Sequence, residues 1–271
     1  MKVLRLNKLK PVILKIGGSV ITDKSGELAA RMQDISRLAE EIQNANVQNL
    51  IIIHGGGSFG HPLAQQHNIK AGFKEESQRV GFAETHHVMT VLNGLLMDAL
   101  IWRNIPAVSI TPSSCIMTKK GRIQCFEEAP LKMLLEMGFL PVMYGDAVLD
   151  TELGFTILSG DQLVSNIATR FNAERIIVGV DVDGVYDDDP KVKKTAKMFK
   201  HLTVGELKKL QRKLDKPTAC DVTGGMLGKI TELLPALEKG IPVTVLNATK
   251  PNYIYKALKG EMVKGTLIEK E

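Results

Sequence analysis

The segment Val12-Ile13-Leu14-Lys15-Ile16-Gly17-Gly18-Ser19 combines a buried strand with a polar loop. Its first five residues are almost all apolar and mostly β-branched or leucine, which is typical of a strand covered on both faces. Two glycines follow at once, and a backbone without side chains leaves room for a ligand to approach closely. Lys15 needs an anionic partner, because an unpaired charge inside an apolar strand is costly. The segment therefore predicts a buried strand that ends at an anion-binding loop.

Further apolar runs alternate with helical patterns along the rest of the chain. Strands are expected at 50–53, 107–110, 140–144, 175–180 and 242–246. Helices are expected at 31–44, 77–103, 127–138, 160–172, 204–214 and 226–239. This alternation predicts an α/β fold, a layered α/β/α sandwich with a mostly parallel central sheet. Segments 115–126 and 147–158 each contain a glycine turn and are predicted as β-hairpin additions that cover a site.

Length and composition indicate an ordinary globular protein. We expect the 271 residues to form a single domain, 1–271, with an N-terminal acceptor-binding lobe at about 1–172 and a C-terminal nucleotide-binding lobe at about 173–271. The net charge of +5 is mild, and the basic cluster at 191–194 has no interleaved aromatics, so we expect an anionic small substrate and no nucleic acid. No apolar run approaches the ~18 residues that span a membrane. Three cysteines without a CxxC pair fit a reducing, cytoplasmic location.

Two more glycine-rich segments contain groups suited to phosphate. Residues 54–61 read His-Gly-Gly-Gly-Ser-Phe-Gly-His after a strand, and residues 223–229 read Thr-Gly-Gly-Met-Leu-Gly-Lys before a helical pattern. Backbone N–H groups in such loops bind phosphate, and lysine supplies a mobile positive charge. Three segments of this kind predict a phosphoryl-transfer site.

Two familiar nucleotide motifs fit these segments less well. Gly55 to Gly60 satisfies the GxGxxG dinucleotide pattern, but the acidic residues about 20 positions on, Glu75 and Glu76, lie in a polar segment with no strand before it. The 224–229 segment is one residue shorter than a P-loop, and Ile230 replaces the Ser or Thr that would hold Mg²⁺. Both readings are disfavoured.

The motifs together resemble the amino acid kinase family. They are the segment 15–19, the glycine loop at 54–61, Ser159-Gly160-Asp161, the run 181–186 from Asp181 to Tyr186, and the segment 223–229, in family order over about residues 12–268. The resemblance implies an ATP-dependent phosphotransferase. Gly-Ser-Phe-Gly-His61-Pro62 and Tyr144-Gly145-Asp146 are most similar to members that phosphorylate a prenyl monophosphate such as isopentenyl phosphate. A kinase of another acceptor such as fosfomycin, or a non-catalytic nucleotide-sensing module, remains an alternative.

The resemblance also implies site residues, a cofactor set and an assembly. Catalytic roles are implied for Lys15, Lys24, His61, Asp161 and Lys229. The nucleotide is expected to contact Lys15, Gly17, Gly18, Ser19, Gly57, Asp181, Gly225 and Lys229. The acceptor is expected to contact Gly56, His61 and Gly160. ATP and Mg²⁺ are the expected cofactors, with no direct protein ligand to the metal because Asp161 reaches it through water. A homodimer is the family-level expectation.

Two remaining expectations come from the residues themselves. Phe82 and Met89 lie at near-helical spacing in the 77–103 helix and are predicted to wall an apolar acceptor pocket, with ordinary core packing as the alternative. The acidic run 187–190 is predicted to be a solvated turn. The histidines other than His61 are expected to have packing or surface roles only.

Overall fold

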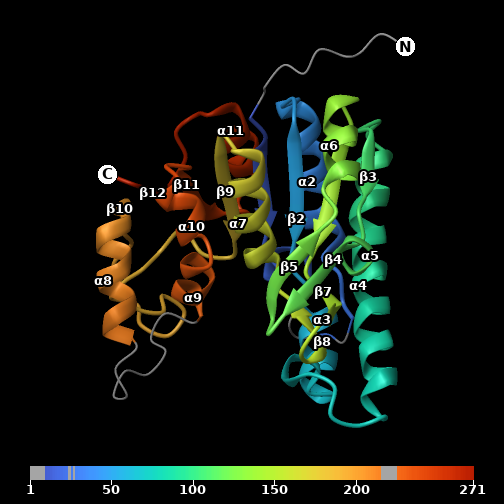
Figure 1. Cartoon of the computed structure of the whole chain (residues 1–271). Coiled ribbons are helices and arrows are strands. Elements are labelled where there is room, and N and C mark those ends of the chain that lie inside the picture. Colours follow the sequence, from blue (N-terminus) through green and yellow to red (C-terminus); the bar gives the residue numbers. More distant parts are fainter. Residues whose placement is uncertain (1–9, 24–25, 27, 215–224) are drawn as a thin grey trace.

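The computed structural model describes residues 10–23, 26, 28–214 and 225–271 (Figure 1). Lys24 and residues 223–224, which belong to the predicted site, lie outside these residues. An eight-stranded sheet runs through both halves of the chain. In spatial order its strands are β10 (His201–Thr203), β12 (Gly265–Glu269), β11 (Val243–Asn247), β9 (Arg175–Val180), β1 (Val12–Ile16), β2 (Leu50–His54), β6 (Leu140–Tyr144) and β3 (Ala107–Ser109).

The predicted fold class is confirmed. Strands β11, β9, β1, β2, β6 and β3 are parallel, and β12 is antiparallel to β11 while β10 is parallel to β12. Strand β1 lies between β9 and β2, with Ile16 opposite Gly179 on one side and His54 on the other. All five residues of β1 are buried, as its continuous apolar pattern predicted.

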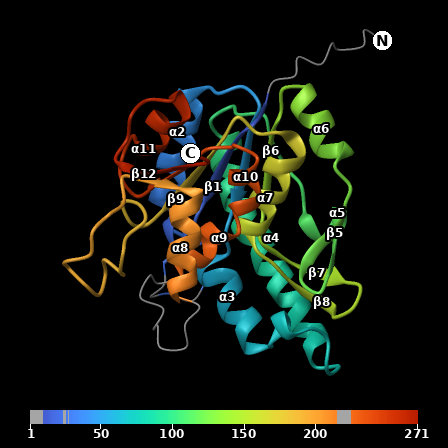
Figure 2. The same ribbon diagram turned by 60° about the vertical axis from the view of Figure 1, so that its left-hand side comes forward.

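Helices cover both faces of this sheet (Figures 1 and 2). One core contains residues such as Val12, Leu14 and Ile52, and its helices are α1 (Gly18–Ile21), α2 (Met32–Ala45), α3 (Gly57–Gln66), α4 (Gln78–Ile101) and α11 (Tyr253–Lys259). The opposite core contains Ile13 and Ile51, and its helices are α6 (Ala129–Glu136), α7 (Gly160–Phe171), α8 (Val204–Leu214), α9 (Met226–Thr231) and α10 (Leu234–Glu238). Alternate residues of each strand thus enter different cores, which is the layered α/β/α arrangement.

A second sheet is formed by both predicted hairpins, in the lower half of Figure 1. Its order is β5 (Arg122–Phe126), β4 (Ile116–Lys119), β7 (Asp146–Asp150) and β8 (Gly154–Leu158). The pairs β4–β5 and β7–β8 are antiparallel, so both hairpins are confirmed, and β4 meets β7 in parallel. The short helix α5 (Pro112–Cys115) leads directly into this sheet.

Some elements differ from the sequence-based expectations. Helix α3 (Gly57–Gln66) was not predicted, because its first turn contains glycines and Pro62 lies inside it. The helix predicted at 226–239 is two helices, and Pro235 lies in the first turn of the second of them. Strands β10 and β12, helix α11 and the 3₁₀ turn Ile69–Ala71 were also missed. No helix within the described ranges is long and apolar enough to cross a membrane.

The buried histidine at the end of β2 makes the stability of this fold sensitive to acid. His54 is fully buried, stacks on Tyr144 with ring centroids 5.4 Å apart, and lies 3.3 Å from the side-chain oxygen of Asn93. Burial lowers its pKa from 6.5 to about 4, which outweighs its hydrogen bonds to Gly55 and Asn93. As the pH falls, the His54 ring takes up a proton near pH 6.5 in the unfolded chain but only near pH 4 in the folded chain. Acid therefore favours the unfolded state between these two pH values.

We expect the free energy of unfolding to fall by about 3 kcal/mol, through this group, as the pH drops from 6.5 to about 4. Urea unfolding at a series of pH values measures it. His54→Gln should flatten that part of the curve, whereas His87→Gln, at an exposed position of α4, should leave its shape unchanged. An unaltered slope in His54→Gln would contradict the assignment.

Candidate active site

A cavity of about 510 Å³ opens at the carboxyl ends of strands β1, β2, β6 and β9. Parallel strands place their following loops at one edge of the sheet, which is where ligands bind in open α/β folds. The loops after these four strands all contribute to the cavity wall, and β8 and helices α3, α4, α7 and α9 complete it.

Most of the predicted site residues meet in this cavity. Those that line it are Lys15, Gly18, Ser19, Gly56, Gly57, His61, Met89, Gly160, Asp161, Asp181 and Lys229. Gly17, Gly225 and Phe82 do not line it, although Gly17 and Gly225 adjoin residues that do. Residues from six separate segments are therefore brought together by the fold, and the roles implied for them stay predictions.

A buried ion pair lies in the cavity wall. The ammonium of Lys15 on β1 lies 2.8 Å from a carboxylate oxygen of Asp161 on α7. The two side chains are only 4% and 14% exposed. Asp161 is the anionic partner that Lys15 in the apolar strand requires, and both residues line the cavity.

The first two glycine loops pack backbone against backbone. A Cβ on Gly18 would overlap the backbone nitrogen of Gly57, and a Cβ on Gly57 would overlap the hydroxyl of Thr22. Gly57 also has a φ of +51°, in the left-handed region that favours glycine. The Thr22 hydroxyl accepts a hydrogen bond from the Ser58 N–H at 3.0 Å. These two positions require glycine, and the close packing leaves backbone groups at the cavity wall.

Helix α3 positions His61 and meets Met89 of α4. His61 lies in the second turn of α3, is exposed, and lines the cavity. A Cβ on Gly56 would lie 2.9 Å from the sulfur of Met89, and one on Gly60 would lie 2.7 Å from it. Met89 is 2% exposed and also lines the cavity, so its side chain packs beneath the glycine loop and forms part of the wall.

Phe82, two turns earlier on α4, lies elsewhere. Its ring centroid is 5.1 Å from that of Phe155 on β8, and it does not reach the cavity wall. The geometry favours the packing alternative for Phe82 and the wall for Met89. The predicted contact of Phe82 with an acceptor stays a prediction.

The loop after β9 contributes a second charged cluster. Asp181 is hydrogen bonded by Lys191, and Asp181, Asp188 and Lys191 all line the cavity. Burial would raise the pKa of Asp181, but the Lys191 ammonium and the Ser19 hydroxyl outweigh it and hold the pKa below its usual range. The run 187–190, predicted as a solvated turn, is an irregular segment of bends and a turn, and three of its residues, Asp188, Asp189 and Pro190, line the cavity.

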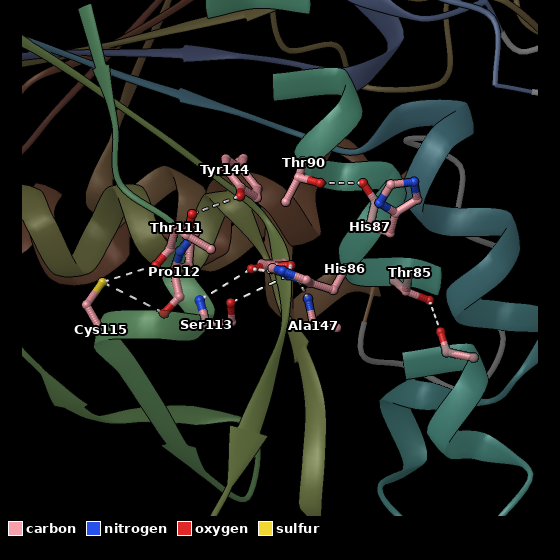
Figure 3. A network of polar contacts seen from close by, with 12 residues as sticks. Thr85, His86, His87, Thr90, Thr111, Pro112, Ser113, Cys115, Tyr144 and Ala147 are labelled. Atoms are coloured by element: carbon pink, nitrogen blue, oxygen red, sulfur yellow. Dashed lines mark hydrogen bonds and ion pairs between the residues drawn. The ribbon is translucent and has the colours of Figure 1, made fainter. Parts of the chain in front are cut away.

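A buried carboxylate that the sequence reasoning left without a role joins three elements at the cavity wall. Asp146 is 1% exposed, and its oxygens accept hydrogen bonds from the N–H groups of Ala147 at 2.8 Å and Ser113 at 3.3 Å. The Nδ1 atom of His86 lies 3.0 Å from the same carboxylate (Figure 3). Burial raises the pKa of Asp146, and the contact with His86 opposes that rise. His86 therefore connects α4 to the first residue of β7.

The chain matches known proteins along nearly its whole length. The model of the amino acid kinase family matches residues 10–247. The isopentenyl phosphate kinase of Methanothermobacter thermautotrophicus is 44% identical over 264 residues, which cover 95% of this chain and 98% of that protein. The chain belongs to the amino acid kinase family. The isopentenyl phosphate kinase of Methanocaldococcus jannaschii is 37% identical, over 95% of this chain and 98% of its own length. A crystal structure of an isopentenyl phosphate kinase superposes with a TM-score of 0.84 at 40% identity, over 95% of this chain and 99% of that one.

In its described residues, this amino acid kinase has charged groups at the cavity wall but no preformed metal site. The described part of the chain contains no group of three or more His, Cys, Asp or Glu side chains that could hold a metal ion. Mg²⁺ in kinases is commonly held through substrate phosphates and one or two carboxylates, so a dedicated protein cage is not required. Asp161, at the cavity wall beside Lys15, fits the role of a carboxylate near such an ion.

Removing one partner of the Lys15–Asp161 pair should destabilise the fold more than removing both partners. Asp161→Asn leaves the buried Lys15 charge without its partner, and we expect a loss of about 3–5 kcal/mol in the free energy of unfolding. Adding Lys15→Met should recover much of that loss while the double variant stays inactive. Chemical denaturation measures both effects. Glu128→Gln, which breaks the exposed pair with Arg170, is the control and should cost less than about 1 kcal/mol. Equal stability of Asp161→Asn and wild type would contradict this account.

Proposed function

We propose that this chain transfers the terminal phosphoryl group of ATP to isopentenyl phosphate and so forms isopentenyl diphosphate and ADP. The observation that carries the proposal is a single cavity that combines two kinds of wall. Lys15, Lys229 and the glycine loops supply phosphate-binding groups. The apolar remainder includes Pro62, Ala64, Met89, Ile157 and Leu158. A substrate with a phosphate head and a hydrocarbon tail suits such a cavity, and the relatives of similar length bear the name of this activity.

The proposed chemistry needs charge and alignment rather than a general base. An oxygen of the acceptor phosphate, already ionised at neutral pH, forms a bond to the terminal phosphorus of ATP. The bond from that phosphorus to the bridging oxygen breaks, and the electron pair leaves with ADP. The charge that develops on the three equatorial oxygens is stabilised by fixed cations and N–H donors.

Individual residues take roles in this scheme. Lys15 and Lys229 are the cations, and Asp161 holds the Lys15 ammonium in place at 2.8 Å. The backbone at Gly56 and Gly57 approaches the phosphates, as the mutual packing of the glycine loops allows. Because His61 lines the cavity at an exposed position, it donates a hydrogen bond to the acceptor phosphate. Bound Mg²⁺ would neutralise part of the triphosphate charge.

The remaining parts of the proposal concern positions and properties beyond this geometry. Lys24 is proposed as a further cation for the transition state. The lobe at about 1–172 is proposed to bind the acceptor and the lobe at about 173–271 the nucleotide. We also propose a cytoplasmic homodimer that depends on Mg²⁺. Sedimentation should give about twice the chain mass of 29.7 kDa, and chelation of divalent metal should abolish turnover.

An acceptor screen that follows ADP release tests the function directly. The purified chain is given ATP, Mg²⁺ and one of isopentenyl phosphate, dimethylallyl phosphate, fosfomycin, UMP or acetylglutamate. The highest kcat/KM is expected for isopentenyl phosphate. A higher value for any acceptor outside the prenyl phosphates, or ADP release that no acceptor stimulates, would overturn the proposal.

His61 provides the sharpest test of acceptor binding. Because its hydrogen bond strengthens as charge develops on the acceptor phosphate, His61→Ala should lower kcat/KM by roughly 10²-fold. His61→Gln should retain part of the activity by hydrogen bonding. His87→Ala, on the exposed face of α4, is the control and should keep full activity. Near wild-type turnover in His61→Ala would remove this residue from the site.

The two predicted pocket residues on α4 should respond differently to truncation. Met89→Ala enlarges the cavity wall, so ten-carbon prenyl monophosphates should gain activity relative to the five-carbon substrate. Phe82→Ala removes packing against Phe155, so it should cost about 2–5 kcal/mol of stability without changing that ratio. The measurements are the ratio of kcat/KM for the two substrates and the free energy of unfolding. A changed ratio in Phe82→Ala alone would reverse the two assignments.

A further inference from the structure

Lys229 lies on a short helix that has no side-chain cap and few buried residues. Helix α9 has six residues. Its N-cap residue is Gly225, with a φ of +75°, and a glycine has no side chain to cap the first turn. Only Leu227 and Ile230 of this helix are buried. Helices this short are marginal on their own, so their orientation depends on tertiary contacts. The position of the Lys229 ammonium therefore depends on what anchors α9.

A two-pronged ion pair joins the end of α9 to the hairpin sheet. The two terminal nitrogens of Arg122, the first residue of β5, each lie 2.9 Å from a different oxygen of Glu232. Glu232 follows the last residue of α9 and is three positions from Lys229. Paired N–H···O bonds between two planar groups fix orientation as well as distance. The contact also raises the pKa of Arg122, through its hydrogen bonds to Glu232.

The backbone on both sides of Arg122 is itself fixed. The buried side chain of Gln162 accepts a hydrogen bond from the N–H of Ile123 at 2.9 Å and donates one to the carbonyl of Gly121 at 3.0 Å. The N–H of Gly121 donates to Asp150 at 2.7 Å. Gln162 is the residue after Asp161 on α7. A continuous set of contacts thus runs from the helix that carries Asp161 to the helix that carries Lys229.

We propose that the Arg122–Glu232 pair is a positioning clamp that sets Lys229 against the Lys15–Asp161 pair across the cavity. This inference rests on the proposed function, because it assigns Lys229 to the migrating phosphoryl group. Neither clamp residue lines the cavity, so both act through Lys229 and are positioning residues. The hairpin sheet then contributes to the site in two ways. Strand β8 forms part of the cavity wall, and β5 sets the position of Lys229 through Arg122.

A clamp and an ordinary surface ion pair predict the same small effect on stability, but only the clamp predicts a loss of kcat. The side chains of Arg122 and Glu232 are 61% and 31% exposed, and exposed pairs contribute little to stability. Removal of the clamp should therefore leave the melting temperature close to wild type. Catalysis is more sensitive, because a displacement of about 1 Å at a reacting group can cost up to 10²-fold in rate.

Kinetics of clamp variants test the proposal. Glu232→Ala and Arg122→Ala should each lower kcat by roughly 10-fold to 10²-fold with little change in either KM, and the double variant should be no worse than either single one. The charge-swapped pair Arg122→Glu with Glu232→Arg should recover part of the loss. Lys208→Ala breaks the exposed pair between Lys208 and Glu238, at 2.6 Å, and is the matched control with unchanged kcat.

Two further measurements separate this proposal from the function on which it rests. In a Lys229→Met background, Glu232→Ala should cause no additional fall in kcat. Amide hydrogen exchange without substrate should become faster across 226–231 in Glu232→Ala and stay unchanged in α7. This second readout requires no activity, so it tests the clamp even if the acceptor is not a prenyl phosphate.

Three results would overturn the clamp. They are an unchanged kcat in both single variants, an equal additional loss in the Lys229→Met background, and unchanged exchange across 226–231. If Lys229→Met itself has wild-type kcat, the assignment of Lys229 fails and the positioning role fails with it, whereas faster exchange in Glu232→Ala would still show that the pair anchors α9.

Discussion

The buried ion pair between Lys15 and Asp161 is the constraint on which the centre of this molecule depends. Strand β1 lies in the middle of the main sheet with both faces covered, and a charge there is tolerated only with a partner. The pair connects β1 to the first turn of α7, so the strand and the helix cannot shift independently. The two side chains that meet this structural requirement are the same two that we propose for catalysis, and both lie at the cavity wall.

Close packing of backbone controls the shape of the cavity floor. Gly18 and Gly57 follow neighbouring strands, and neither position has room for a side chain. The order of the strands explains why two loops nearly forty residues apart meet, because β1 and β2 pair in parallel and end at one edge. Glycine in these loops is therefore required for packing between the loops, apart from the phosphate contacts that we propose.

Two buried carboxylates, one at each end of β7, attach the hairpin sheet to α4 and α5 and join its two turns. Asp146 gathers Ala147, Ser113 and His86 at the start of the strand. Asp150 accepts hydrogen bonds from backbone N–H groups of both hairpin turns at its end, and although burial would raise its pKa, these bonds from Gly121, Leu153 and Glu152 hold it well below its usual range. Hydrogen bonds that an ionised carboxylate accepts from N–H groups are shorter and stronger than those between neutral groups. Of the two hairpins, only the second contributes to the cavity wall, through Asp146, Ile157 and Leu158.

Sequence alone predicted the parallel strands of the main sheet, the layered fold class and both hairpins, and most of the site residues that it predicted line the cavity, because these follow from local periodicity, glycine loops and a lysine in an apolar strand. Tertiary structure alone decided how distant side chains combine. Met89 and Phe82 are equivalent by helical spacing, yet Phe155 occupies the space beside Phe82 and leaves Met89 at the wall. The partners of His86 and Arg122 lie 60 and 110 positions away, so no local pattern contains them. Helix α3 also needed the fold, because packing against α4 overrides its glycines and proline.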